Sequence, residues 1–305
     1  MVKRSFVLGE EWIYYKFYTG KKTADKILAE AIKPAVDYLL DTKQVDQWFF
    51  IRYVDPDWHL RVRLHLTNAN GIGTVIQTIY KYIERFVEQE LIWKVQADTY
   101  QRELERYGVS TMELSEQLFF HSSELILSAL PFFKDQKGET LRWLFALMQV
   151  DSLLNSFNYT LSDKLRLLQG LKDAFGNEFG MNHFLKSQLD AKYRKQRNLI
   201  EQTLSNSREK EPATLRLIEV INANDEFINR IAQRILHHHQ NNSLEIPLDS
   251  LLSSYIHMLM NRTFRSKQRL HELVIYDFLF RFYTSEIAKE KYRTSSLPGK
   301  TVSTQ

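Results

Sequence analysis

The sequence predicts an α+β protein in which a strand-rich first third is followed by a mainly helical remainder. Between residues 10 and 107, short alternating or continuously apolar stretches are typical of strands, whereas beyond residue 110 apolar residues recur with the helical period. Only 10 glycines and 6 prolines occur in 305 residues, so long regular elements should dominate. We expect one unit over 1–294, with a strand-rich part at 1–109, a helical part at 110–294 and a disordered tail at 295–305.

In the first third, four stretches are predicted strands and two are predicted helices. Residues 47–54 are almost wholly apolar, as expected for a strand covered on both faces. Residues 59–66 alternate strictly between apolar and basic residues, and a turn at 55–57 joins these two stretches into a hairpin. We therefore expect a small mixed sheet with flanking helices. The strands cover residues 11–18, 47–54, 59–66 and 94–108, the last ending at Gly108, and the helices cover residues 22–40 and 74–91.

The remaining two thirds of the chain carry a succession of helical patterns separated by short breaks. Polar runs at 205–213 and 237–247 predict exposed loops between some of them. The last long pattern begins near Pro247 and continues towards residues 269–283, which predicts one long final helix. The other helices are expected at residues 112–130, 139–157, 162–175, 182–206 and 214–239.

Composition excludes several classes of site. The chain has no cysteine, which excludes disulfides, thiolate nucleophiles, zinc fingers and iron–sulfur clusters. A net charge of +4 and a pI of about 9.0 permit an anionic ligand but do not demonstrate nucleic-acid binding. The N-terminus lacks the apolar core and cleavage site of a signal peptide, and no apolar run approaches the roughly 18 residues of a membrane helix. We predict a cytoplasmic protein with no membrane span.

The strand at 59–66 is the most informative segment. Its basic face carries Arg61 and Arg63, flanked by His59 and His65, with no acidic residue among them. Planar guanidinium groups in such a row suit a carboxylate or phosphate ligand. A basic edge strand that discourages aggregation is the alternative. In either case we expect both arginines on a polar strand face, where their removal opens no core cavity.

Two further segments favour simple structural interpretations. Gly71 and Gly73 precede a helix, but Ile76 stands where a dinucleotide-binding fingerprint needs its third glycine, so a turn is predicted. The three histidines at 237–239 end a helix, where cationic side chains are favourable. We expect no metal site there.

His257 and residues 103–108 leave two interpretations open. His257 lies in an apolar helical stretch and is either a core histidine or a proton-transfer residue. Asn261 and Arg265 follow at one and two turns on roughly the same face, and a purely structural histidine does not need this polar stripe. Residues 103–108, taken alone, are a strand end with a local Glu–Arg pair.

Three blocks of sequence together resemble one known family. They are WFFIRYVDPDWHLRVRL at 48–64, YQRELERYG at 100–108 and YIHMLMNR at 255–262. In this order and spacing they are similar to the elimination domain of class I lantibiotic dehydratases. That domain also occurs alone in split dehydratases and in thiopeptide-type bacteriocin biosynthesis. The similarity extends from Trp12 to Tyr283 and covers nearly the whole chain.

The resemblance implies a lyase that forms dehydroalanine or dehydrobutyrine in lanthipeptide or thiopeptide-type biosynthesis. In the family, a peptide serine or threonine is first esterified with glutamate from glutamyl-tRNA. The elimination domain then removes the α-proton and expels glutamate. Three arginines match the family's essential arginines, a glutamate and a histidine match its other implicated positions, and we expect no cofactor or metal. The catalytic candidates are Arg61, Arg63, Glu103, Arg106 and His257, and the substrate-binding candidates are His59 and Asn261.

The resemblance also implies partners and alternatives. The chain lacks the long glutamylation region, so it should be a standalone half that receives a glutamylated precursor peptide from a separate glutamyl-tRNA-dependent subunit. We expect no direct tRNA binding, because the charge is modest and no aromatic–basic RNA motif is present. A pyridine synthase, which joins two dehydroalanines, and a non-catalytic peptide-binding subunit stay open, although the retained arginines and His257 favour elimination. The sequence leaves open the precursor, the preference for Ser or Thr, the acid or base role of His257, and the oligomeric state, a homodimer included.

Overall fold

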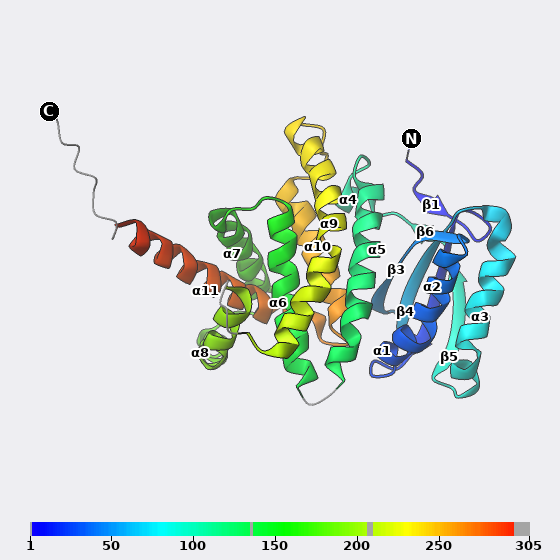
Figure 1. Cartoon of the computed structure of the whole chain (residues 1–305), viewed down its shortest axis with the longest axis horizontal. Helices are drawn as coiled ribbons and strands as arrows, with labels where there is room; N and C mark the ends of the chain where they lie inside the picture. The colour runs from blue at the N-terminus through cyan, green and yellow to red at the C-terminus, as the bar shows by residue number, and fades with distance from the viewer. Residues whose placement is uncertain (1, 135–136, 206–209, 296–305) are drawn as a thin grey trace.

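The computed structural model describes residues 2–134, 137–205 and 210–295, and it has the predicted α+β architecture. The strands and the first helices form one end of the molecule, and the later helices form the other end (Figure 1). Helix α5 (Met112–Ala129) lies between them and packs against the sheet. No helix of the described residues is long and apolar enough to cross a membrane. Of the tail predicted at 295–305, residue 295 is the last residue of helix α11 (Gln268–Ser295), and residues 296–305 and loop residues 206–209 lie outside the described residues.

The four long strands form one sheet in the order β3-β4-β2-β5. The predicted order of strand, helix, hairpin, helix and strand is confirmed, and it gives the split β-α-β arrangement of ferredoxin-like folds. All neighbouring strands are antiparallel, where the sequence predicted a mixed sheet, because β4 separates β2 and β3, which run in the same direction. The strands are β2 (Trp12–Thr19), β3 (Val45–Val54), β4 (Trp58–Leu66) and β5 (Ile92–Asp98).

The two faces of the sheet differ as the alternation in β4 predicts. Leu60, Val62 and Leu64 are fully buried beneath the helices of the first third. Arg61 and Arg63 lie on the opposite face, which contributes aromatic residues to the core of the helical part. The first face therefore builds the core of the N-terminal end, and the second carries the candidate chemistry. The covering elements are α1 (Ala24–Ile27), η1 (Leu28–Ile32), α2 (Lys33–Asp41) and α3 (Ile72–Glu88), which follows η2 (Ala69–Gly71).

The predicted fourth strand ends at Asp98 rather than at Gly108. The chain turns away from the sheet because the Tyr100 hydroxyl and the Arg102 guanidinium both donate to Glu116 of α5, each at 2.7 Å. The segment containing Glu-Arg-Tyr-Gly is a short helix and not a strand end. Its elements are β6 (Tyr100–Gln101), which pairs with β1 (Ser5–Phe6), and α4 (Leu104–Tyr107).

The predicted final helix is two helices, α10 and α11. Between them Phe264 is extended, with φ −98° and ψ 130°, and Lys267 has a positive φ of 53°. No glycine or proline stands between the two helices, which explains why the helical pattern runs through the break. Residues 237–240, predicted as loop, belong to α9. The remaining elements are η3 (Leu130–Phe133), α6 (Gly138–Ser156), α7 (Leu161–Glu178), α8 (His183–Leu204), α9 (Pro212–Gln240), α10 (Leu248–Thr263) and α11 (Gln268–Ser295).

Side chains of α5 and α10 close the β3 edge of the sheet. The main chain of Phe50 donates to Oγ of Ser123 at 3.2 Å and accepts from Nε of Arg262 at 2.9 Å. The main chain of Arg52 donates to Oδ1 of Asn261 at 2.9 Å and accepts from its Nδ2 at 2.8 Å. These bonds replace those that a further strand would make, so they fix the helical part against this edge.

A buried ion cluster holds the same junction. Asp25 of α1 accepts from Nη2 of Arg52 and from Nη2 of Arg142, each at 2.6 Å. Burial alone would raise the pKa of Asp25, but the two guanidinium groups outweigh it and lower that pKa. One carboxylate thus connects α1, β3 and α6, and leaving either arginine unpaired in this interior would be costly.

Candidate active site

Arg63 is enclosed by aromatic rings on the second face of the sheet. Its guanidinium carbon lies 4.5 Å from the ring centre of Tyr14, 4.8 Å from that of Tyr100 and 5.2 Å from that of Phe49. The residue is 8% exposed, and its Nε is buried without a hydrogen-bond partner. Burial lowers the pKa of Arg63, against the influence of Tyr100, Tyr14 and Glu103. The expectation that its removal opens no cavity is therefore wrong, because these aromatic side chains cover it.

Arg61 lies on the same face and is partly exposed. Its guanidinium carbon is 3.4 Å from the ring centre of Tyr53, and its Nε donates to Nε2 of His59 at 3.1 Å. His59 donates in turn from Nδ1 to the main-chain oxygen of Asp57 at 2.8 Å. Both ring nitrogens of His59 are thus engaged, and the structure places it as a support for Arg61.

Glu103 is the residue before α4, and Arg106 lies in the single turn of that helix. Oε2 of Glu103 and Nη1 of Arg106 are 3.2 Å apart, and the side chains are 61% and 46% exposed. The predicted local pair is therefore present. An exposed pair of this kind contributes little stability, so a ligand can compete for either group at small cost.

His257 is held by a buried carboxylate. Its Nδ1 lies 2.8 Å from Oε1 of Glu272, whose side chain is fully buried, whereas the His257 side chain is 32% exposed. The hydroxyl of Tyr276 donates to the same oxygen at 3.0 Å. Because a carboxylate accepts the proton on Nδ1, the pairing leaves Nε2 available for proton transfer. Glu272 was not predicted, since it lies in another helix and only the break after α10 brings it to His257.

Arg63, Glu103, Arg106 and His257 line three neighbouring pockets. His257, Glu272 and Arg106 line one of about 230 Å³, Arg106 and Glu103 line one of about 410 Å³, and Glu103 and Arg63 line a space of about 30 Å³. Each pocket shares a lining residue with the next, so Arg63, Glu103, Arg106 and His257 border a row of three neighbouring pockets. The space at Arg63 admits about one water, so a larger group reaches it only if neighbouring side chains move.

Four of the residues singled out from sequence lie outside these three pockets: Arg61, His59, Asn261 and Arg265. Asn261 bonds to the β3 edge, and its Nδ2 also lies 2.9 Å from Oε1 of Gln268. The predicted polar stripe does not continue to Arg265, which lies beyond the end of α10 and pairs with Glu139.

Arg262 is a further buried cation, which the sequence showed only as part of the 255–262 block. It is 1% exposed, and its Nη2 is buried without a partner. Burial, opposed by Tyr107 and reinforced by the charge of Arg63, lowers the pKa of Arg262 to about 9. Among the described residues no carboxylate forms an ion pair with Arg61, Arg63 or Arg262. This unbalanced positive charge beside the pockets favours an anionic ligand.

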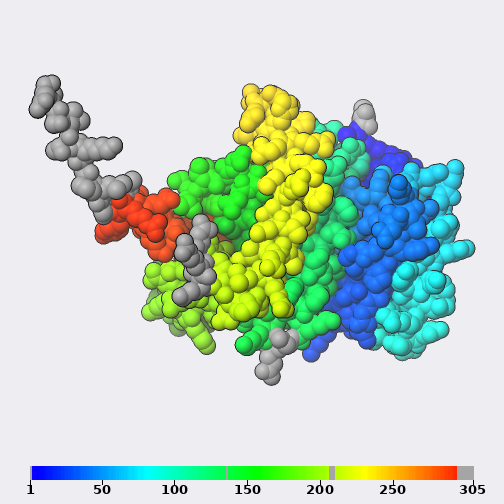
Figure 2. Space-filling model, viewed as in Figure 1, coloured from blue at the N-terminus to red at the C-terminus, as the bar shows by residue number. Residues whose placement is uncertain are grey.

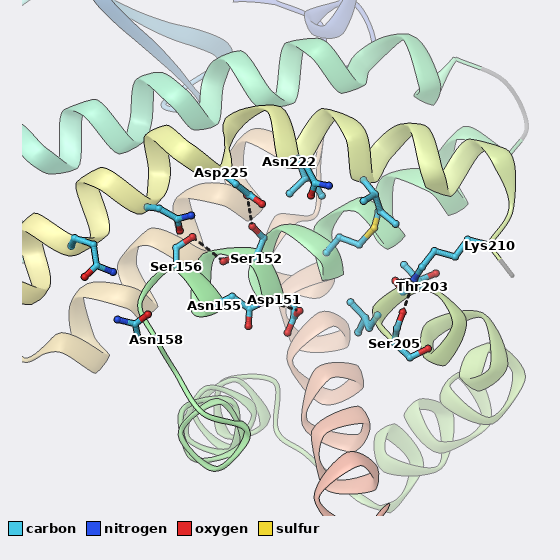
Figure 3. Close-up of a pocket in the computed structure, with 16 residues that line it drawn as sticks. Asp151, Ser152, Asn155, Ser156, Asn158, Thr203, Ser205, Lys210, Asn222 and Asp225 are labelled. Carbon is cyan, nitrogen blue, oxygen red and sulfur yellow. Dashed lines mark hydrogen bonds between the residues drawn. The ribbon is translucent and has the colours of Figure 1, made fainter. Parts of the chain in front are cut away.

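A further pocket lies apart from this region (Figure 3). It has a volume of about 670 Å³ between α6, α8 and α9, and polar side chains from α6 and α9 point into it. Ser152 donates to Asp225 across it at 2.9 Å. No residue singled out from sequence lines it. Among the described residues no three His, Asp or Glu side chains converge as metal ligands, and His237 and His238 bond to Asn241 and Ser243.

A family model described as lantibiotic biosynthesis dehydratase C-terminal matches residues 12–283. The chain belongs to this family. The resemblance read from the 48–64, 100–108 and 255–262 blocks is thereby confirmed.

Two curated proteins resemble this lantibiotic dehydratase C-terminal chain. Nisin biosynthesis protein NisB of Lactococcus lactis subsp. lactis is 26% identical over 293 residues, which are 90% of this chain and 26% of NisB. Subtilin biosynthesis protein SpaB of Bacillus subtilis is 25% identical over 173 residues, which are 56% of this chain and 17% of SpaB. The chain thus spans about a quarter or less of the length of these relatives.

Solved structures share the fold of this lantibiotic dehydratase C-terminal chain. The tRNA-dependent lantibiotic dehydratase MibB from Microbispora sp. 107891 matches with a TM-score of 0.71 and 19% identity, over 95% of this chain and 29% of MibB. The pyridine synthase TbtD from thiomuracin biosynthesis matches with a TM-score of 0.63 and 13% identity, over 92% of this chain and all of TbtD. TsrL matches with a TM-score of 0.61 and 12% identity, over 91% of this chain and 95% of TsrL.

In this lantibiotic dehydratase C-terminal chain we expect Glu272→Gln to lower the turnover of His257-dependent chemistry about 10²-fold. The amide keeps a hydrogen-bond acceptor but removes the negative charge that faces the imidazole, so a positive charge that forms on the ring during proton transfer is no longer stabilised. Single-turnover rates, compared with the exposed control Glu226→Gln on α9, measure the effect, and thermal melting checks that both variants are folded. A folded Glu272→Gln variant with a normal rate would leave Glu272 a packing residue.

Proposed function

We propose that the chain eliminates glutamate from glutamylated serine or threonine residues of a ribosomal precursor peptide, which leaves dehydroalanine or dehydrobutyrine. The observation that carries the proposal is a row of three neighbouring pockets bordered by Arg63, Glu103, Arg106 and the carboxylate-held His257. The membership in the dehydratase C-terminal family supports it.

The cations suit the two negative charges of the reaction. The glutamyl group carries a carboxylate, which a planar guanidinium binds through paired, charge-assisted hydrogen bonds. Arg106 is accessible to that carboxylate from the 410 Å³ pocket. Negative charge develops on the peptide carbonyl once the α-proton is lost, and Arg63, with Arg61 and Arg262 near it, supplies fixed positive charge in a largely water-free setting.

His257 is the proton-transfer residue of the proposal. A base removes the proton from the α-carbon, the electron pair forms the carbon–carbon double bond, and the bond from the β-carbon to the ester oxygen breaks. Glutamate leaves as a carboxylate, so the proton can remain on the base or pass to the leaving group. His257 lines the 230 Å³ pocket, and its Nε2, which the bond to Glu272 leaves available, can serve either step.

The substrate must be supplied by another activity. We infer that a glutamyl-tRNA-dependent activity outside these residues, on a separate subunit as the resemblance implies, esterifies the precursor peptide. The aromatic residues that line the three pockets are buried and so are not available to stack on RNA bases. We therefore infer that the chain receives the peptide after that step and without contact to tRNA. The cytoplasm, where charged tRNA is available, is the compartment we infer for both reactions.

Incubation of the purified chain with a chemically glutamylated peptide tests the proposal. We expect mass spectrometry to show loss of the glutamyl group as glutamate and a dehydrated peptide. The exposed-site variant Arg85→Ala is the matched control and should behave as the wild type. The match to TbtD over nearly the full length of both chains makes cycloaddition the second candidate. An intact glutamyl-peptide, together with cyclisation of a peptide that carries two dehydroalanines, would replace elimination with that reaction.

A further inference from the structure

The two edges of the sheet differ in whether other parts of the chain bond to their main chain. The β3 edge is closed by side chains of α5 and α10, which bond to the main chain of Phe50 and Arg52. β5 forms the other edge, and in the described residues its main chain has hydrogen-bonding partners on β2 only. Every second residue of β5 therefore presents its main-chain N–H and C=O outward, which is the template that another strand needs.

Apolar side chains surround this open edge. Trp93 and Val95 of β5 are 52% and 39% exposed, and Ile76 and Tyr80 of α3 are 38% and 56% exposed. Arg85 reaches Glu30 from one flank of α3, which places Ile76 and Tyr80 on the opposite flank, nearest the open edge. This end of the molecule, coloured cyan, lies farthest from α11, and no other part of the chain covers it in the view of Figure 2. We call these four side chains together with β5 the β5 edge surface.

The sequence of β5 is complementary to itself. In a two-fold antiparallel pairing the same faces of both copies meet, so each residue must oppose one of its own face. If Gln96 lies on the axis, Lys94 opposes Asp98 of the second copy and Val95 opposes Ala97. Both ends of the pairing then carry one opposite-charge pair, and the apolar face continues across the junction with Trp93 beside it. Shifting the axis to Val95 places Lys94 against Gln96 and leaves Asp98 opposite Ile92.

We propose that the β5 edge surface binds a second copy of this chain, joining the two sheets through antiparallel β5 strands in the register centred on Gln96. Lys94 is exposed, with its Nζ 4.8 Å from the ring centre of Tyr18, and is free to swing towards the partner. Asp98 already pairs with Lys16 and keeps a side-chain exposure of 37%, so it can receive a second lysine. The surface lies two strands away from Arg63 in the sheet.

A charge exchange tests the register directly. Lys94→Glu places two carboxylates opposite each other at both ends of the pairing, and Asp98→Lys places two ammonium groups opposite each other there. Sedimentation velocity should therefore show each variant associating about tenfold more weakly than the wild type. An equal mixture of the two variants restores both attractive pairs and should recover association. Lys81→Glu, the same charge change on the far flank of α3, should leave the dimer intact, and thermal melting checks that each variant is folded.

The other outcomes contradict the proposal. The proposal is wrong if the wild-type chain stays monomeric at high micromolar concentration. It is also wrong if the wild type forms a dimer whose association neither Lys94→Glu nor Asp98→Lys weakens. A mixture that stays as weak as its components would refute the Gln96-centred register. A monomer whose Trp93 fluorescence shifts only on addition of precursor peptide would assign the edge to an extended peptide instead. None of these readouts depends on elimination activity.

Discussion

Replacement of Arg63 by lysine should reduce the elimination of glutamate about 10²- to 10³-fold while the chain stays folded. Lysine keeps the positive charge but has no planar fork, so it cannot stack among Tyr14, Phe49 and Tyr100 while presenting two parallel donors. Alanine is the less informative change, because a buried side chain removed from this aromatic enclosure leaves a cavity and lowers stability.

The measurement is single-turnover loss of the glutamyl group, with thermal melting alongside. Arg85→Lys is the matched control, since Arg85 also lies over an aromatic ring, 4.6 Å from the ring centre of Phe86, but far from the pockets. We expect the control to eliminate normally. Near-wild-type turnover by Arg63→Lys would show that the charge alone matters and that bidentate recognition at this position is wrong.

The faces of the sheet could be predicted because they depend on local alternation. The strict pattern of 59–66 assigns Leu60 and Val62 to one face and Arg61 and Arg63 to the other, and the structure confirms this. The same pattern could not predict how deeply Arg63 is buried. That depends on Tyr100, which belongs to a different strand and reaches Arg63 only because Arg102 and Tyr100 are anchored to α5.

The site beyond the sheet could be predicted only in part, because its supports are distant in sequence. Glu272 contacts His257 because the chain reverses between α10 and α11. The sequence between these helices contains no glycine or proline, so the break could not be predicted. In the sequence, Arg262 is an ordinary charged residue near the end of a helix. In the structure it is buried because its Nε donates to the main-chain oxygen of Phe50 in β3. Family resemblance located the chemistry-bearing residues, and tertiary contacts decided which of them border the pockets.

Replacement of His257 by glutamine should leave a stable protein that accumulates glutamyl-peptide, with a rate lower by about 10²- to 10⁴-fold. Glutamine fills much of the volume and can still donate a hydrogen bond to Glu272, but it cannot take up or release a proton near neutral pH. His121→Gln is the matched control, because His121 is also partly buried and stacked on an aromatic ring, 4.7 Å from the ring centre of Phe227, yet lines none of the three pockets.

Chemical rescue separates proton transfer at His257 from a packing role. His257→Ala should enlarge the 230 Å³ pocket beside Glu272, and added imidazole can then occupy the vacated position against the same carboxylate. We expect imidazole to restore part of the elimination rate in His257→Ala, with a rate that follows the neutral or the protonated form according to whether the group acts as base or acid. His257→Gln should not respond, because its side chain fills the position. A glutamine variant that melts early but eliminates normally once folded would make His257 a structural partner of Glu272, and the arginines would then be the remaining catalytic candidates.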